Sequence, residues 1–234
     1  LTLIDTAEMY GEGGAEEVVA QAMAGRRSEI FLVSKVYPHN ASKQGVVAAC
    51  ERSLKRLNTD YLDLYLLHWR GSVPLSETLE AFQMLKAAGK IRDYGVSNFD
   101  IEDMEEAVHL EEGKAIATNQ VLYNLTRRGI ERNLLPWCQQ RQIPMMAYSP
   151  IEQGRLLNNR ALKTMAQERG VTPAQIAIAW LLHQGEVIVI PKSSRIEHIA
   201  QNYAALNLTL SREELAALDA AFPAPARTIP LAML

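Results

Sequence analysis

YLDLYLLHW, residues 61–69, has the pattern that decides the fold of this chain. Apolar residues run with little interruption from Tyr61 to Leu67, and the ionisable residue His68 follows at once. A short, nearly continuous apolar run is typical of a parallel strand covered on both faces. In barrels built from such strands, the chemistry is carried at the carboxyl ends of the strands. We therefore predict a buried parallel strand here, with His68 at its functional end.

Runs of the same kind recur along the chain: LTLI (1–4), IFLVS (30–34), IRDYGVS (91–97), IATNQ (116–120), PMMAYS (144–149) and VIVIP (187–191). The segments between them have apolar residues at helical spacing. In residues 45–57, for example, one face carries Val46, Cys50, Leu54 and Leu57. A further helix is expected to begin at Ser76 and end at Gly89, and a last one at 211–222 begins with Ser211.

Alternating strands and helices predict an α/β fold in which helices cover a parallel sheet. The predicted architecture is a TIM-type (β/α)8 barrel that forms a single domain, residues 1–234, with an extra C-terminal helix. Seven strands are found where a closed barrel has eight. Because Leu1 opens directly into a strand, the first β/α unit is the one expected to be absent. A doubly wound open sheet is the alternative, but GEGGAE (11–16) does not match its G-x-G-x-x-G loop.

The bulk composition excludes several classes of protein. The chain has 234 residues, is 48% hydrophobic and carries a net charge of −3, so one large core is expected and a nucleic-acid partner is not. No apolar run approaches the roughly 20 residues of a membrane span, and residues 1–5 do not resemble a signal peptide. The two cysteines form neither a disulfide framework nor a metal pair. These features predict a cytoplasmic protein without a membrane partner.

Polar or ionisable residues follow nearly every predicted strand. They are Asp5 with Tyr10 five positions on, Lys35, His68 with Trp69, Ser97-Asn98, Gln120, Tyr148-Ser149 and Lys192-Ser193. Each alone has a simple structural interpretation: a helix cap, a buried histidine, a solvated lysine. Four titratable residues associated with consecutive strand ends are harder to explain in this way, because those ends meet on one side of a barrel.

Several motifs now carry a family resemblance: DTAEMYG (5–11), Lys35, LLHW (66–69), GVSNF (95–99), NQVLYN (119–124), AYSP (147–150) and IPKSS (190–194). In order and spacing they resemble the aldo-keto reductases, from Leu1 to the C-terminus. DTAxxYG alone is moderately specific, and the whole series is strongly so. Within the family, the chain looks closest to bacterial reductases of small dicarbonyls such as methylglyoxal. The resemblance implies NADPH-dependent reduction of small aldehydes or ketones without a metal.

At matching positions, the resemblance implies a catalytic set of Asp5, Tyr10, Lys35 and His68. Hydride addition to a carbonyl carbon needs a general acid within hydrogen-bond reach of the oxygen, and Tyr10 takes this role. The Lys35 ammonium would stabilise the tyrosinate left behind, and Asp5 would keep Lys35 paired and aimed. His68 would orient the carbonyl oxygen, and Trp69 would form an apolar wall of the substrate pocket.

The same resemblance implies that the nicotinamide carboxamide is bound by Ser97, Asn98 and Gln120, and that its ring stacks on Tyr148 next to Ser149. The 2′-phosphate of NADPH is expected where the last strand leads into a helix, at Lys192, Ser193, Ser194, His198 and Asn202. The family usually has arginine at the position of His198. Since histidine supplies no fixed charge, the preference for NADPH over NADH is expected to be soft. The alternative is that Ser193 and Ser194 only cap the helix that follows the last strand.

Three other functions stay open. The first is a catalytically idle, cofactor-binding subunit of the same fold, such as the potassium-channel β subunits. The second is a Schiff-base aldolase with Lys35 as the nucleophile. The third is a purely structural barrel fragment. An intact catalytic set argues against the first, and Tyr10 and His68 have no necessary role in the second.

Overall fold

The computed structural model describes residues 2–234. The strand order is β1-β2-β3-β4-β5-β6-β7, so the seven described strands follow the order of the chain and their number is confirmed. The chain divides into two compact units that meet in sequence between Asn119 and Gln120. Each unit is described by itself, and the assignment of residues 1–234 to one domain stays a prediction.

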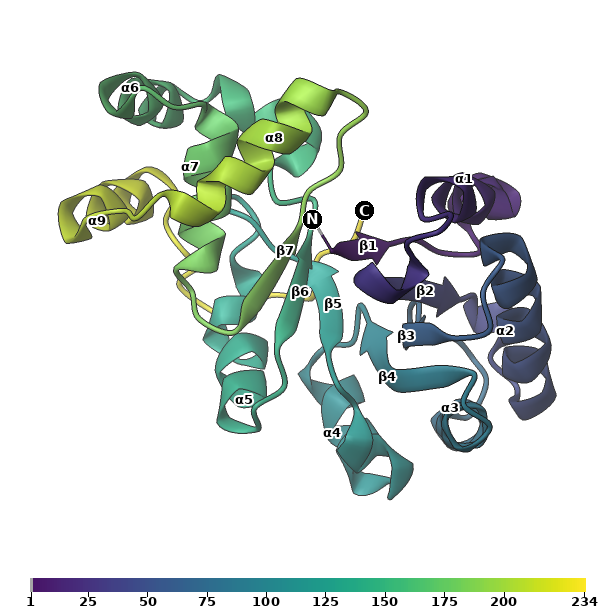
Figure 1. Ribbon diagram of the computed structural model, residues 1–234. Helices are drawn as coiled ribbons and strands as arrows, with labels where there is room; N and C mark the ends of the chain where they lie inside the picture. The colour runs from purple at the N-terminus through teal and green to yellow at the C-terminus, as the bar shows by residue number, and fades with distance from the viewer. Residues whose placement is uncertain (1) are drawn as a thin grey trace. The chain divides into compact units, whose positions relative to one another are not determined.

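The first unit contains four complete parallel strands: β1 (Leu3–Asp5), β2 (Phe31–Val36), β3 (Leu62–Leu67) and β4 (Ile91–Ser97). Its α-helices are α1 (Gly14–Ala22), α2 (Lys43–Leu57), α3 (Leu75–Ala87) and α4 (Ile101–His109). In Figure 1, α1, α2 and α3 lie along one side of β1–β4. The order of strands and helices is the one that the hydrophobic pattern predicts.

Strand β3 and helix α2 show how the pattern becomes structure. All six residues of β3 are buried, as expected for a parallel strand covered on both faces. Helix α2 begins after Ser42, whose hydroxyl accepts a hydrogen bond from the Gly45 N–H. The predicted apolar face of α2 is confirmed, because all four of its residues are buried: Val46, Cys50, Leu54 and Leu57.

Most element boundaries differ from the predicted runs, and the differences at α3 and β5 are described here. Helix α3 begins at Leu75, one residue before Ser76, because Leu75 is itself buried in the first turn. Strand β5 spans Asn119–Leu122 rather than the predicted 116–120, since the buried run continues through Val121 and Leu122. Gln120 therefore lies inside β5 and not at its end.

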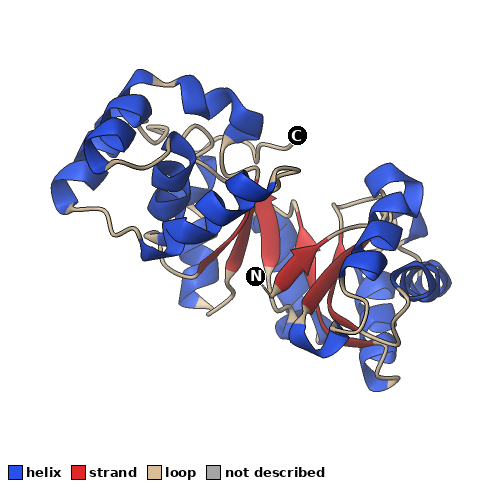
Figure 2. Ribbon diagram, turned by 45° about the horizontal axis from the view of Figure 1, so that its top comes forward, coloured by secondary structure: helices blue, strands red, loops and turns tan. Residues whose placement is uncertain are grey.

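The second unit contains most of β5, together with β6 (Met145–Tyr148) and β7 (Val187–Ile190), which pair in parallel. Its helices are α5 (Leu134–Gln140), α6 (Arg160–Arg169), α7 (Pro173–Leu182), α8 (Ile196–Ala204) and α9 (Arg212–Ala221). Helix α7 packs against β7, α6 and α8, and α6 also packs against α9. In each unit the helices flank the strands (Figure 2). The predicted last helix is α9, with Ser211 as its cap.

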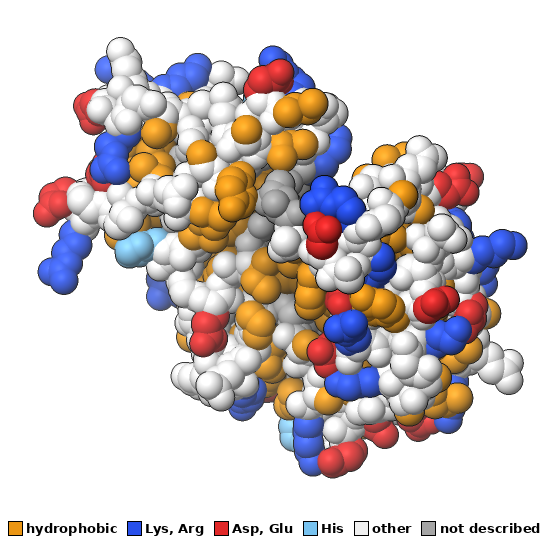
Figure 3. Space-filling model, in the orientation of Figure 1, with side chains coloured by type: hydrophobic (Ala, Val, Ile, Leu, Met, Phe, Trp, Pro, Cys, Tyr) orange, Lys and Arg blue, Asp and Glu red, His pale blue; other side chains and the backbone are white. Residues whose placement is uncertain are grey.

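The surface carries charges of both signs. On the face shown in Figure 3, acidic and basic side chains are interspersed, in keeping with the net charge of −3. Neither sign forms a continuous patch on the described part of that face. None of the described helices has both the length and the apolar character that crossing a membrane requires.

Candidate active site

Four of the predicted site residues lie at the carboxyl ends of strands in the first unit. Asp5 is the last residue of β1, Lys35 is the last but one of β2, His68 follows β3, and Ser97 ends β4. Since β1 to β4 are parallel, all four lie at the same end of this part of the sheet.

Lys35 is the centre of the arrangement. Its side chain is fully buried, and its Nζ donates to three oxygens: Asp5 Oδ1 at 2.5 Å, the Thr6 carbonyl at 2.9 Å and the Tyr10 hydroxyl at 3.3 Å. An ammonium has three N–H donors, so each has an acceptor here. A buried cation is tolerated only when it is paired in this way. The structure thus places a compensated positive charge next to the Tyr10 hydroxyl.

Tyr10 is carried by the loop that follows β1. The Tyr10 N–H donates to the Ala7 carbonyl at 3.1 Å, which closes a turn after Asp5. The next residues of the loop include Gly11 and Gly13, both with positive φ (59° and 93°), a conformation that glycine adopts at low cost. Tyr10 is 38% exposed, whereas Lys35 below it is fully buried. Tyr10 is therefore partly open to solvent, whereas the Lys35 amine is not.

His68 is fixed on both sides by neighbouring strands. Its N–H donates to the Val36 carbonyl at 3.0 Å, and its own carbonyl accepts from Asn98 Nδ2 at 3.1 Å. Its ring meets the Tyr10 ring edge-on, with 5.6 Å between centroids. The ring is only 8% exposed, and its Nδ1 has no hydrogen-bond partner among residues 2–234. Burial, reinforced by the charge of Lys35, lowers the pKa of His68 to about 3. His68 is thus a neutral imidazole at physiological pH.

The depressed pKa of His68 predicts a pH dependence of stability. Between its ordinary value of 6.5 and about 3, the unfolded chain takes up a proton on His68 that the native protein does not bind. Stability is therefore lost as pH falls through this window. Between pH 7 and pH 5, the wild type is expected to lose about 1–2 kcal/mol more unfolding free energy than His68→Gln. Urea unfolding of both proteins at the two pH values measures this difference. An equal loss in both contradicts the prediction.

Two aromatic residues stand next to His68. Trp69, predicted as a wall of the pocket, lies 4.9 Å from His68 between ring centroids. Tyr37 is not among the predicted site residues, and its ring lies 5.7 Å from that of Trp69 and 6.4 Å from that of His68. The ring of His39 also packs against Tyr37, with 4.6 Å between ring centroids. Because Tyr37 comes two positions after Lys35, the alternation of side chains along a strand is the signal that could have found it.

The predicted nicotinamide-binding residues are divided between the two units. In the first, Ser97 is buried at the end of β4, and Asn98 has a left-handed backbone with φ of 57°. In the second, Gln120 is buried within β5, with its Nε2 3.8 Å from Met146 Sδ. Tyr148 ends β6 half-buried, and Ser149 follows it with φ of 49°. Each unit therefore carries hydroxyl and amide side chains of this predicted set within its strands or directly after them.

The segment predicted to bind the 2′-phosphate lies between β7 and α8. Lys192 and Ser194 are exposed, and the hydroxyl of Ser193 accepts from the Arg195 N–H at 3.1 Å. Helix α8 begins after Arg195, whose own side chain makes no capping hydrogen bond. Arg195, and neither serine, occupies the N-cap position of α8, and the role of the two serines stays a prediction. The exposed His198 and half-buried Asn202 lie within the helix.

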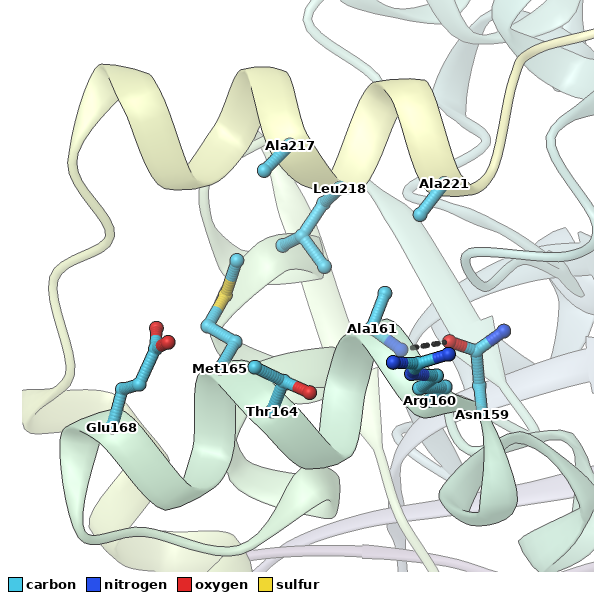
Figure 4. Close-up of a pocket in the computed structure, with 9 residues that line it drawn as sticks. All are labelled: Asn159, Arg160, Ala161, Thr164, Met165, Glu168, Ala217, Leu218 and Ala221. Atoms are coloured by element: carbon cyan, nitrogen blue, oxygen red, sulfur yellow. Dashed lines mark hydrogen bonds between the residues drawn. The ribbon is translucent and has the colours of Figure 1, made fainter.

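A separate groove lies between α6 and α9 and has a volume of about 550 Å³ (Figure 4). Met165 and Leu218 face each other across it, and Glu168 and Arg160 lie along α6 at its rim. None of its lining residues is a predicted site residue. Among residues 2–234, no three His, Cys, Asp or Glu side chains are grouped as metal ligands would be.

Comparison with solved structures identifies the class of fold. An aldo/keto reductase from Klebsiella pneumoniae, in complex with NADP and acetate, superimposes with a TM-score of 0.98 and is 55% identical. The match covers all of this chain and 84% of that one. The prediction of a (β/α)8-type barrel fold is thereby confirmed.

The chain belongs to the aldo/keto reductase family, whose model matches residues 1–222. It is 57% identical to the methylglyoxal reductase YeaE of Escherichia coli (strain K12), over 96% of this chain and 81% of that protein. It is 36% identical to the glyoxal reductase of Bacillus subtilis (strain 168), over 93% of this chain and 77% of that protein. The resemblance found in the sequence motifs is confirmed.

Proposed function

We propose that this protein reduces small aldehydes and ketones with NADPH, and that its substrates include dicarbonyls such as methylglyoxal. The observation that carries the proposal is the contact of the buried Lys35 Nζ with both Asp5 and the Tyr10 hydroxyl, with His68 beside the Tyr10 ring. The relatives named above, a methylglyoxal reductase and a glyoxal reductase, support the substrate class. We further propose a cytoplasmic location.

The chemistry divides between cofactor and protein. NADPH, when bound, supplies the hydride that adds to the carbonyl carbon. The protein must then deliver a proton to the carbonyl oxygen, and Tyr10 is the acidic hydroxyl with an accessible side chain. As its O–H bond breaks, the negative charge that develops on the Tyr10 oxygen faces the Lys35 ammonium, 3.3 Å away. Asp5 holds that ammonium in place.

His68 and the aromatic residues have a different role. Because it is neutral, the His68 imidazole can donate an N–H to the carbonyl oxygen without adding a second cation next to Lys35. Trp69 and Tyr37 give the substrate an apolar surface.

The residues present fit a nicotinamide cofactor. The uncapped first turn of α8 offers backbone N–H groups to an anion, and Lys192 adds an ammonium next to it. Arg195 lies there too, with its Nε 3.7 Å from Glu197. This donor set suits the 2′-phosphate of NADPH. We propose that Ser97, Asn98, Gln120, Tyr148 and Ser149 bind the nicotinamide end, and Lys192, Ser193, Ser194, His198 and Asn202 the phosphate.

Cofactor choice gives a direct prediction about Lys192. Lys192→Ala is expected to raise KM for NADPH about tenfold or more, with little change in KM for NADH, because only NADPH carries the 2′-phosphate that the ammonium pairs with. His198→Arg is expected to strengthen the preference for NADPH, since it adds a fixed charge to the same segment. Initial rates with both cofactors measure the two effects. Equal effects on NADPH and NADH contradict the assignment of Lys192.

The function itself is tested by NADPH consumption with the intact protein. Methylglyoxal, diacetyl and a sugar aldehyde serve as substrates, and turnover is expected to be fastest with the dicarbonyls. Absence of turnover with all carbonyls, together with tight NADPH binding, would favour the idle cofactor-binding subunit instead. A Schiff-base aldolase has no structural support, because the Lys35 amine is buried and its three N–H groups have acceptors.

A further inference from the structure

Glu8 is a buried carboxylate in the loop between Asp5 and Tyr10, and the mechanism above does not use it. The residue is 8% exposed. Its Oε1 accepts two hydrogen bonds, from the Tyr37 N–H at 2.9 Å and from Asn40 Nδ2 at 3.0 Å. Its Oε2 lies 3.5 Å from a guanidinium nitrogen of Arg52, whose side chain is half-exposed. The carboxylate therefore has a donor at each oxygen.

The partners of Glu8 come from the segment that follows Lys35 in the chain. Tyr37 is two residues beyond Lys35, and Asn40 ends the short 3-10 helix Pro38–Asn40. The Glu8 N–H also lies 3.4 Å from the Lys35 carbonyl. Glu8 thus joins the loop that carries Tyr10 to the loop that continues from Lys35.

Besides the turn closed at the Ala7 carbonyl and the edge-on contact with the His68 ring, the restraints on the Tyr10 side chain are weak. Its side chain is 38% exposed, so packing covers only part of it, and its hydrogen bond with Lys35 is long at 3.3 Å. By contrast, a carboxylate that accepts two N–H bonds in a buried place holds its partners with charge-assisted strength. Glu8 is only two residues from Tyr10, so the tether acts close to the phenol.

We propose that Glu8 is a positioning residue for Tyr10. Its carboxylate locks the Tyr10 loop onto the Tyr37–Asn40 segment, and so fixes the distance between the Tyr10 hydroxyl and the Lys35 amine. The proposal rests on the proposed function, in which Tyr10 is the proton donor. A displacement of a reacting group by about 1 Å can cost about 10²-fold in rate.

The test compares Glu8→Gln and Glu8→Ala with Glu12→Gln, which makes the same change of charge at an exposed position of the same loop. All variants are made in the intact protein. Glu8→Ala is expected to lower kcat for methylglyoxal about 10–100-fold, with the Kd for NADPH within about twofold of wild type. Glu8→Gln keeps an acceptor oxygen, so its kcat is expected to fall less than that of Glu8→Ala. Glu12→Gln is expected to match wild type.

A second arm separates positioning from a general effect on folding. In the Tyr10→Phe background there is no phenolic proton to position, so Glu8→Gln is expected to lower kcat less than about threefold, because groups acting as a unit are not additive. Equal fold-losses in the two backgrounds overturn the proposal, as does a Glu8→Gln enzyme with the kcat of Glu12→Gln. An inactive wild type instead overturns the proposed function. If Glu8→Ala does not fold, Glu8→Gln carries the test.

Discussion

Replacing Tyr10 by phenylalanine is expected to lower carbonyl reduction by about 10²–10⁴-fold, the contribution of a positioned general acid. The substitution removes one hydroxyl and keeps the ring that meets His68 edge-on. NADPH binding should therefore be nearly unchanged. The loss is expected in kcat, because the proton is transferred in the transition state and not in the binding step. Steady-state rates with methylglyoxal, and quenching of cofactor fluorescence, measure the two quantities separately.

The matched control for this experiment is Tyr61→Phe. Tyr61 directly precedes β3, at the opposite end of that strand from His68, and packs against the guanidinium groups of Arg27 and Arg92. The Tyr61→Phe variant also loses one phenolic hydroxyl, and it is expected to keep the activity of the wild type. A Tyr10→Phe enzyme that binds NADPH and still reduces methylglyoxal within about threefold of wild type contradicts the role of Tyr10 as the acid.

The strand ends could be predicted because their signal is local. A buried parallel strand needs apolar residues at nearly every position, and β3 meets this requirement. The first polar residue after the apolar run therefore marks the end of the strand. This places His68 correctly from nine residues of sequence. Asp5 and Ser97 also end their strands, although β1 is only half-buried and β4 contains Arg92 and Asp93. Strand β5 begins with Asn119 and Gln120, two polar residues, so the local signal places its boundaries wrongly.

The support of the site could not be predicted, because it depends on contacts between distant loops. Nothing near Glu8 in the sequence indicates that its carboxylate accepts from Tyr37 and Asn40, about thirty positions away. The amide of Asn98 donates to the His68 carbonyl in the same unpredictable way. The depressed pKa of His68 is also a tertiary property, since it follows from burial next to a cation.

Lys35→Met is the second substitution with a large expected effect. It keeps most of the apolar stem of the side chain but removes the cation that faces the Tyr10 oxygen, so reduction should fall by about 10²–10⁴-fold. It also removes the ammonium that pairs with the Asp5 carboxylate, whose side chain is 11% exposed. Breaking a buried pair in this way costs about 3–5 kcal/mol of stability. Lost activity alone would therefore not separate chemistry from unfolding.

The double variant Asp5→Asn/Lys35→Met resolves this ambiguity. Because it removes both charges of the pair, it is expected to recover most of the unfolding free energy lost by Lys35→Met. Activity should not return, because the positive charge next to Tyr10 is still missing. Thermal unfolding and kcat for methylglyoxal, measured on the same preparations, test the two expectations together. If activity returned with stability, Lys35 would only support the fold.

A second double variant tests whether Tyr10 and Lys35 act together. Adding Tyr10→Phe to Lys35→Met is expected to lower kcat far less than the product of the two single losses, since the pair acts as one proton-donating unit.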